Sequence, residues 1–313
     1  MIMDAAEFAP LPGQALALRD DLVVVLAPNP SPMTGPGTNT YLLGRDRLVV
    51  IDPGPAIPAH LTAVLQAIGG RVVDHILVTH SHLDHAALAP ALAAETGAAV
   101  CAYGGATTGR SAVLVALVAR GLTGGGEGID HNFAPDRMLA DGDVLDGDWG
   151  RITAIHTPGH LGNHLCFLWG DGLFSGDHVM GWASSLVSPP DGDLTDFMVS
   201  CRKLQGVSAG QFYPGHGAPV TDPQARLTWL IAHRLQREAQ IIDALTAGPA
   251  TPQAVTAQVY PDLSALLAKA AERNVLAHLI DLHTRGIVTA APAPDAEAVF
   301  RLSKPVLSPP RGI

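Results

Sequence analysis

A histidine-rich run directly after an apolar segment constrains this chain more than any other feature. Residues 76–78 (ILV) have the character of a buried strand, and residues 79–85 (THSHLDH) follow at once. Imidazoles and a carboxylate at the end of a buried strand are costly to bury unless a shared cation compensates them. The run therefore predicts a metal centre at one edge of a sheet. Its candidate ligands are His80, His82, Asp84 and His85.

Length and composition indicate a folded α/β protein. A chain of 313 residues can form one large domain with a small appendage. No apolar run approaches the roughly 20 residues of a membrane span, and the first ten residues do not resemble a leader peptide. We therefore expect a cytoplasmic protein without a membrane partner. The cysteines are widely spaced, which predicts reduced core residues rather than disulfides or a thiolate zinc site: Cys101, Cys166 and Cys201.

The acidic charge is concentrated in the first two thirds of the chain. The sequence has 19 basic and 29 acidic residues, a net charge of −10. From Asp222 onward there are nine basic and eight acidic residues, which leaves ten and twenty-one before it. Bound divalent cations would offset part of this excess, whereas a long polyanion would be repelled. The balance disfavours tight, nonspecific binding of nucleic acid.

Short apolar segments alternate with helical patterns in this first part. Some pairs of segments are joined by tight turns such as 170–172 (GDG), and others by helices, which predicts mixed sheets covered by helices. The expected helices span Ala59–Ile68, Ala86–Glu95 and Asp196–Leu204. The expected strands are Leu22–Leu26, Thr40–Leu43, Leu48–Ile51, His75–Val78, Ala98–Ala102, Ile152–Ile155, Leu165–Trp169 and Gln211–Tyr213.

A different pattern follows Pro223. It predicts a long amphipathic helix, a short helix capped by Thr251, a third helix that ends at Gly286, and two short strands. Three helices and a small hairpin are typical of a winged helix. The domains that we expect are 1–222 (catalytic), 223–305 (winged helix) and 306–313 (a tail). The predicted C-terminal elements are Ala225–Leu245, the helix after Thr251, Leu263–Arg285, Ile287–Thr289 and Val299–Leu302.

Three later motifs could join the first one. They are 156–160 (HTPGH), 174–178 (FSGDH) and 213–217 (YPGHG), each after a strand-like segment and each with a glycine that allows close approach. Strand ends at one edge of a sheet can bring them together. Isolated histidines, by contrast, we assign to packing or surface: His60, His75, His131, His156, His233, His278 and His283.

In this order the motifs resemble those of the metallo-β-lactamase superfamily, from about Asn39 to Gly217. The resemblance implies an αββα sandwich as the fold of the first domain, and Asp52 as a support that hydrogen-bonds to the site. It also implies Asp177 as a carboxylate that bridges two metal ions. The ligands that it implies are His80, His82 and His160 for one ion, and Asp84, His85 and His216 for the other.

These ligand types predict two Zn²⁺ ions per chain, with Mn or Fe as alternatives. Such ions can make a shared water an effective nucleophile near neutral pH. We assign catalytic roles to Asp84 and His178, the second because it adjoins Asp177. For His178, and for His164 beside His160, a structural role is an equal alternative.

Longer segments resemble the β-lactamase-like protein 2 branch, whose members carry a C-terminal winged helix. They are 32–42 (PMTGPGTNTYL), 175–182 (SGDHVMGW), His233-Arg234 and 275–279 (VLAHL). The branch implies either thioester or single-stranded RNA substrates. Our first hypothesis is a zinc hydrolase of a small ester or thioester, and the alternative is an RNA phosphodiesterase. The arginines that the alternative would place along an RNA groove are Arg226, Arg234 and Arg237.

Other hypotheses have less support. A DNA-binding metal sensor would use the winged helix, but such a module more often packs on the catalytic domain or forms a dimer surface, so a second copy of the chain is a further candidate partner. Hydrolysis of β-lactams is also compatible with the motifs. We expect substrate walls at Gly181–Asp193 and Met33–Asn39, and a mobile surface loop at Gly121–Gly128.

Overall fold

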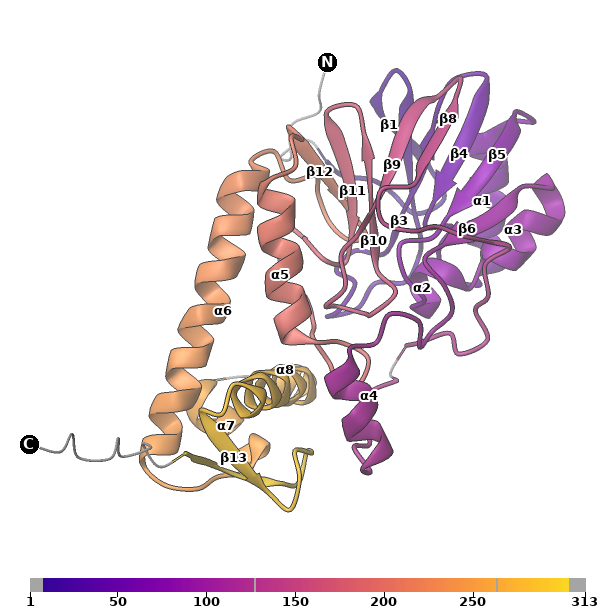
Figure 1. Cartoon of the computed structure of the whole chain (residues 1–313). Helices are drawn as coiled ribbons and strands as arrows, with labels where there is room; N and C mark the ends of the chain where they lie inside the picture. The colour runs from indigo at the N-terminus through magenta and orange to yellow at the C-terminus, as the bar shows by residue number, and fades with distance from the viewer. Residues whose placement is uncertain (1–7, 127, 263, 304–313) are drawn as a thin grey trace, which may run out of the picture.

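The computed structural model describes residues 8–126, 128–262 and 264–303. Two β-sheets lie face to face, with helices on their outer faces, and a smaller helical unit follows them (Figure 1). The predicted tail at 306–313 and the predicted helix start at Leu263 lie outside the described residues.

The first sheet has seven strands in sequence order. Its first four strands pair antiparallel, and its last four pair parallel. Helices α1 (Pro58–Ile68) and α3 (Ala89–Thr96) lie in the first two of the three parallel crossovers, on the outer face. The strands are β1 (Ala15–Arg19), β2 (Leu22–Leu26), β3 (Asn39–Leu43), β4 (Arg47–Ile51), β5 (Val72–Leu77), β6 (Ala99–Ala102) and β7 (Arg137–Met138).

The second sheet has five strands, with α5 (Leu194–Gln205) on its outer face. The GDG turn at 170–172 joins two of them as a tight hairpin, as the sequence predicts, and α5 carries the chain to a parallel edge strand. The order is β12 (Gln211–Pro214), β11 (Gly172–Gly176), β10 (Leu165–Trp169), β9 (Gly150–His156) and β8 (Val144–Gly147).

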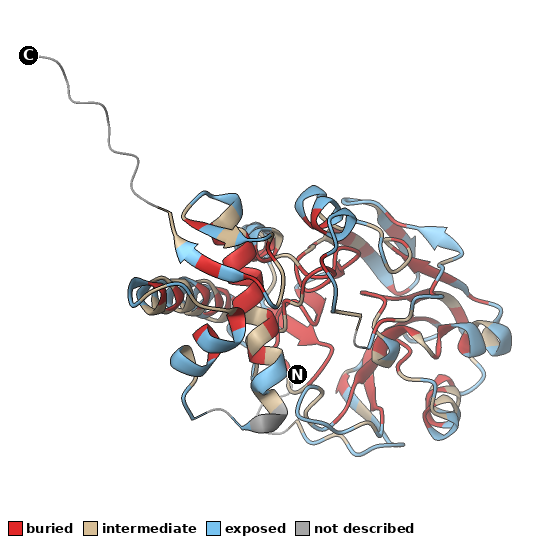
Figure 2. Cartoon of the chain, turned by 90° about the horizontal axis from the view of Figure 1, so that it is seen from below, coloured by how far each residue is buried: buried red, intermediate tan, exposed pale blue. Residues whose placement is uncertain are grey.

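Three apolar layers hold this domain together. Between the sheets, Tyr41, Phe174 and Tyr213 pack with ring centroids 5.2 to 5.9 Å apart. Other clusters lie between the first sheet and its helices, and between the second sheet and α5. Buried residues accordingly follow the strands and the inner helix faces (Figure 2). The αββα sandwich is confirmed.

Local sequence sets where several helices begin and end. Asp193 caps α5 by accepting from the amide of Asp196, and Pro58 and Gly69 bound α1. The helix expected at 86–95 is instead two helices, α2 (Leu83–Ala86) and α3, because the second begins afresh with Pro90 in its first turn. The candidate ligands Asp84 and His85 therefore lie on the short helix α2.

The C-terminal unit is a winged helix, as predicted. It has its own apolar core, which includes Ile241 and Leu245 from the end of α6. Its elements are α6 (Pro223–Thr246), α7 (Pro252–Val259), α8 (Ala265–Thr284), β13 (Val288–Ala291) and β14 (Val299–Leu302).

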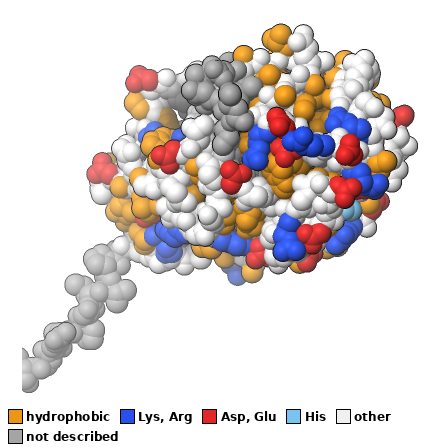
Figure 3. Space-filling model, turned by 90° about the horizontal axis from the view of Figure 1, so that it is seen from above, with side chains coloured by type: hydrophobic (Ala, Val, Ile, Leu, Met, Phe, Trp, Pro, Cys, Tyr) orange, Lys and Arg blue, Asp and Glu red, His pale blue; other side chains and the backbone are white. Residues whose placement is uncertain are grey.

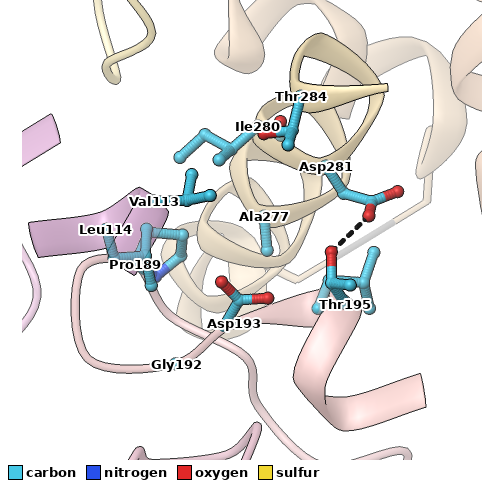
Figure 4. A pocket seen from close by; sticks show the side chains of 11 residues that line it. Val113, Leu114, Pro189, Gly192, Asp193, Thr195, Ala277, Ile280, Asp281 and Thr284 are labelled. Carbon is cyan, nitrogen blue, oxygen red and sulfur yellow. Dashed lines mark hydrogen bonds between the residues drawn. The ribbon is translucent and has the colours of Figure 1, made fainter. Parts of the chain in front are cut away.

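The two units share parts of their cores. Leu227 and Leu230, near the start of α6, pack with α5, whereas the end of α6 packs in the winged helix. Helix α4 (Ala112–Ala119) of the first unit contributes to the winged-helix core, and Thr195 Oγ1 of α5 donates to Asp281 Oδ1 of α8 at 2.6 Å (Figure 4). The expected domain boundary at 222 stays a prediction, since α6 contacts both sides.

The ranges expected from the sequence did not include α4, β1, β7, β8 or β11. Among the described helices, none has the length and apolarity needed to cross a bilayer.

Candidate metal centre

The candidate ligands lie at the carboxyl ends of strands from both sheets. His80 follows β5, His160 follows β9, Asp177 follows β11 and His216 follows β12. Because the sheets face each other, these strand ends converge at one edge of the sandwich. Gly215 permits the approach, since a Cβ there would lie 2.5 Å from His85 Cε1 and 2.6 Å from Asp177 Oδ1.

One group of four facing side chains consists of His80, His82, His160 and Asp177. One ligand-type atom from each lies within 4.8 Å of the others. His82 Nδ1 lies 2.9 Å from His80 Nε2 and 3.0 Å from His160 Nε2. The carboxylate completes the group, with Asp177 Oδ2 at 3.7 Å from His160 Nε2.

The second group consists of Asp84, His85 and His216. His216 Nε2 lies 3.2 Å from Asp84 Oδ2 and 3.3 Å from His85 Nε2. Asp177 reaches this group as well, since its Oδ1 lies 3.4 Å from His85 Nε2 and its Oδ2 lies 3.3 Å from His216 Nε2. The seven side chains grouped from the sequence therefore meet, and Asp177 stands between the two groups.

Backbone carbonyls fix the orientation of two rings. His160 Nδ1 lies 2.6 Å from the carbonyl oxygen of Leu186, and His216 Nδ1 lies 3.1 Å from that of Gly37. A carbonyl only accepts, so each Nδ1 carries the proton. In the neutral rings, both Nε2 atoms therefore present a lone pair to the centre.

Asp52 and Thr79 orient two more rings. Asp52 accepts from the Thr79 amide (2.7 Å), the Thr79 hydroxyl (2.8 Å) and His85 Nδ1 (2.9 Å). Because the Thr79 hydroxyl donates to Asp52, it accepts from His80 Nδ1 at 2.9 Å, which leaves His80 Nε2 as a lone pair. Asp52 adopts φ +50° while buried, a strained conformation that these bonds hold in place. The support predicted for Asp52 thus has a geometric basis.

Facing lone pairs make this centre unfavourable without a cation. His80 Nε2 and His160 Nε2 both face His82 Nδ1, which can donate one proton to only one of them. Asp177 Oδ1 is buried and accepts no hydrogen bond from the described residues. Such groups need a shared positive charge.

The electrostatics of the two groups differ. Burial lowers the pKa of His80 and His160 and lowers that of His82 to about 3, so these rings are neutral at pH 7. Burial acts the same way on His216, but Asp177 and Asp84 outweigh it and raise its pKa to about 9. For His85, likewise, nearby carboxylates outweigh burial and raise the pKa. In the metal-free chain, protons on these two rings therefore compensate the carboxylates.

The structure does not place His178 toward a substrate. Its side chain is fully buried, its ring lies 4.5 Å from that of Phe197, and its Nε2 lies 3.6 Å from Cys201 Sγ on α5. Of the two roles considered for His178, catalytic and structural, this burial favours the structural one, because the ring turns into the core. His164 is also buried: Nδ1 lies 2.9 Å from Thr157 Oγ1, and the ring lies 5.2 Å from that of His80.

Sequence reasoning missed several groups that hold the ligands. Thr79 was quoted only as part of the run, and its hydroxyl connects Asp52 with His80. Thr38 Oγ1 donates to Asp84 Oδ2 at 3.2 Å. A hydroxyl residue beside a ligand motif can be recognised in the sequence as a possible support. A backbone carbonyl such as that of Leu186 can be identified only from the tertiary structure.

A cleft of about 470 Å³ opens beside the centre, between the two units. Its walls include Met33 and Trp182 from the two predicted substrate loops, and Tyr260 and Leu267 from the winged helix. Trp182 Nε1 donates to the carbonyl of His216 at 3.2 Å, which ties this wall to the centre.

Two of the three arginines expected in an RNA groove hold this wall instead. Arg226 donates to the carbonyls of Met180 (2.7 Å) and Ala183 (2.5 Å). Arg234 is buried and donates to the carbonyls at 184 and 185, both at 2.7 Å. Only Arg237 of the three lines the cleft. This arrangement removes the basis for an RNA groove built on the three arginines.

The surface seen from above, at the end of the molecule that carries the N-terminus, has mixed charge. On the face in Figure 3, basic side chains lie beside acidic ones rather than in a continuous basic patch. In the glycine-rich segment predicted as a surface loop, whose residue 127 lies outside the described residues, the Gly126 amide donates to Asp191 Oδ2 at 2.8 Å and the Gly128 carbonyl accepts from the Leu83 amide at 2.7 Å. Gly126 and Gly128 therefore lie near His82.

Known proteins share both units. The family Metallo-beta-lactamase superfamily matches residues 33–216, and the Beta-lactamase associated winged helix domain matches residues 251–294. A Beta-lactamase-like protein 2 homolog of Drosophila melanogaster is 31% identical over 293 residues, which cover 90% of this chain and 94% of that protein. An Atrochrysone carboxyl ACP thioesterase of Aspergillus fumigatus is 31% identical over 236 residues, 73% of this chain and 66% of that protein.

Solved structures agree on the fold. A metallo-beta-lactamase family protein from Thermus thermophilus superposes with a TM-score of 0.73 at 25% identity, over 92% of this chain and 100% of that one. A beta-lactamase domain protein from Burkholderia ambifaria superposes with a TM-score of 0.77 at 21% identity, over 95% of this chain and 96% of that one. With its matching family domain, its relatives and its converging His/Asp centre, this chain belongs to the metallo-β-lactamase superfamily and is a metal-dependent hydrolase with a C-terminal winged helix.

Proposed function

We propose that this protein binds two Zn²⁺ ions and hydrolyses the carbonyl group of an ester or thioester. The observation that carries the proposal is the set of Nε2 atoms that face the centre, on four rings whose Nδ1 atoms are held by acceptors on the outer side. Nitrogen and carboxylate ligands in groups of three or four suit Zn²⁺. His80, His82 and His160 would hold one ion, Asp84, His85 and His216 the other, with Asp177 between them.

Two bound cations would supply Lewis acidity and would lower the pKa of a water toward neutrality. The residues of the chain supply the geometry. Asp52 and Thr79 hold His85 and His80 in one tautomer, and Asp177 supplies negative charge between the groups. Asp84, whose side chain is 25% exposed, faces the open side of the centre.

A carbonyl substrate fits the surroundings better than RNA does. The cleft beside the centre carries few charges, and Arg226 and Arg234 are bonded to backbone carbonyls. Phosphodiester backbones are held mainly by free basic side chains. The name of the Aspergillus relative, an acyl-carrier-protein thioesterase, supports a thioester in particular.

The test combines metal content with substrate comparison. We expect elemental analysis to give about two Zn²⁺ ions per chain for two groups of ligands, and chelation to abolish activity that added zinc restores. The loaded protein should hydrolyse a thioester or ester orders of magnitude faster than single-stranded RNA. Preferential RNA cleavage, or full activity in chelator, would refute the proposal. His82→Ala should lose metal, whereas the exposed His131→Ala should behave as the parent protein.

A further inference from the structure

The cleft between the two units has a mainly apolar lining. Its volume of about 470 Å³ is within the range of small-molecule sites, about 300 to 1,000 Å³. Met33 is 43% exposed and Trp182 is 46% exposed, and both line the cleft. Large apolar side chains left open to water in a concave site mark a place where an apolar ligand binds.

Two residues of the cleft wall hydrogen-bond to candidate ligands of the metal centre. Trp182 contacts the cleft with its ring while its Nε1 donates to the His216 carbonyl at 3.2 Å. Leu186 also lines the cleft, and its carbonyl accepts from His160 Nδ1 at 2.6 Å. Each wall residue thus touches one candidate ligand of a different group. The cleft wall therefore adjoins both groups of candidate ligands, and the cleft is the space next to the centre.

The winged helix forms the far wall. Tyr260 follows α7, and Leu267 and Ala270 belong to α8. Arg237 is the one Arg or Lys among the described residues that line the cleft, and its guanidinium stacks over the Tyr260 ring at 4.4 Å. A single cation is too few for a phosphodiester backbone, whereas small and apolar side chains suit a hydrocarbon group.

We infer that this cleft binds the acyl chain of the substrate, so that the enzyme prefers thioesters or esters with long apolar acyl groups and the winged helix sets their length. The inference rests on the proposed function for its reaction, but the binding of an apolar chain can be measured separately. Each methylene that leaves water contributes about 0.8 kcal/mol, about fourfold in affinity.

Ala270 offers a direct test. Its side chain is half-buried and lines the cleft, so Ala270→Phe fills the space that the chain would occupy. Ala268, exposed two residues earlier on the same helix, provides the matched control Ala268→Phe. The full-length parent and both variants would be assayed with acetyl, hexanoyl and decanoyl thioesters of N-acetylcysteamine.

We expect kcat/KM of the parent to rise about tenfold or more from acetyl to decanoyl. Ala270→Phe should lower kcat/KM for decanoyl by about tenfold or more, the equivalent of two methylenes kept out, with the acetyl value changed less than about twofold. Ala268→Phe should change neither. Equal rates on all chain lengths, or equal losses on all of them in Ala270→Phe, would overturn the inference while leaving the hydrolase function intact.

A binding measurement separates the two ideas further. Calorimetry with the S-decyl thioether of N-acetylcysteamine, which cannot be hydrolysed, should show binding to chelator-treated protein that Ala270→Phe weakens by about tenfold or more. If the protein shows this binding but hydrolyses no thioester, the cleft binds an apolar chain as inferred and the proposed reaction is refuted. Absence of thioether binding to the parent protein would overturn the acyl assignment. So would binding of a single-stranded oligonucleotide in its place that Ala270→Phe weakens.

Discussion

Single hydrogen bonds at the centre determine where each imidazole presents its free nitrogen. Asp52 has the most such bonds, since it receives two from Thr79 and one from His85. A side-chain amide at position 52 could not replace it, because its nitrogen cannot accept the hydrogen bonds that the second carboxylate oxygen accepts. The orientation of the candidate ligands therefore depends on one carboxylate that touches no metal.

We expect Asp52→Asn to weaken Zn²⁺ binding by about 10- to 100-fold, because His85 and Thr79 lose a shared acceptor. Competition with a chromophoric chelator measures the affinity. The exposed Asp46→Asn, in the turn between β3 and β4, serves as the control. Unchanged affinity in Asp52→Asn would show that the packing alone orients the rings.

The two ligand groups should load metal at different pH. His80, His82 and His160 are neutral at pH 7 because burial lowers their pKa, so protons do not compete there. His216, with a pKa raised to about 9, must lose its proton before it binds an ion. Titration of metal-free protein followed by native mass spectrometry should give one ion near pH 6 and two near pH 9. Equal loading at both values would contradict this assignment.

Trp182 tests the substrate wall. We expect Trp182→Ala to raise KM about tenfold, since a large apolar surface leaves the cleft, with metal content unchanged. Trp182→Phe keeps a ring but loses the bond to the His216 carbonyl. Metal loss in both variants would show instead that this bond maintains the centre.

The sequence identified the candidate ligands because they lie in short motifs after strands, where spacing and residue type are visible. Four such motifs together predicted that these side chains converge. Whether they bind metal stays a prediction. The direction of His178 could not be read, because it depends on Phe197 and Cys201, which come from a helix about 20 residues later.

At the scale of elements, strong local patterns were predicted and weak ones were missed. The bounds of β2, β10 and β14 match the prediction, since each is a short apolar or alternating segment between turns. Helix α4 has the sequence AVLVALVA, which is apolar all round and shows no helical period. It forms a helix because Ser111 caps it and because Leu114 and Leu117 pack into the winged helix.

Helix α6 fixes the substrate wall through Arg226. We expect Arg226→Ala to lower the free energy of unfolding by about 2 kcal/mol, because two carbonyls lose a charged donor. KM should rise as the wall at 180–183 loosens, with metal retained. Urea unfolding and steady-state kinetics measure both.

Arg202→Ala, at an exposed position on α5, is the control for loss of an arginine. Arg226→Lys should keep only part of the stability and of the low KM that Arg226→Ala loses, since an ammonium group lacks the forked geometry that reaches both carbonyls. An unchanged KM in Arg226→Ala would mean that the wall does not depend on α6.

At the scale of the whole molecule, buried neutral histidines make stability depend on acidity. Burial lowers the pKa of His60 to about 4 and that of His178 to about 3, and it also lowers that of His278. In the unfolded chain these groups titrate near about 6.5, so between there and about 4 the unfolded state binds more protons than the native one. Stability should therefore fall as pH is lowered through this range.

Urea unfolding of the metal-free protein at several pH values measures the slope. Each such histidine changes the free energy of unfolding by up to about 1.4 kcal/mol per pH unit. His60→Gln, which can still bond to Thr40, should reduce the slope, and the exposed His131→Gln should not. A flat profile below neutrality would show that these rings become protonated without unfolding.

The cleft has one wall from each unit, and only one of those units carries the hydrolytic residues. Substitutions on α8 can therefore change which molecules fit without altering any side chain that performs the bond cleavage. In a lineage of such enzymes, selectivity could diversify through the appended module while the reaction itself stays constant.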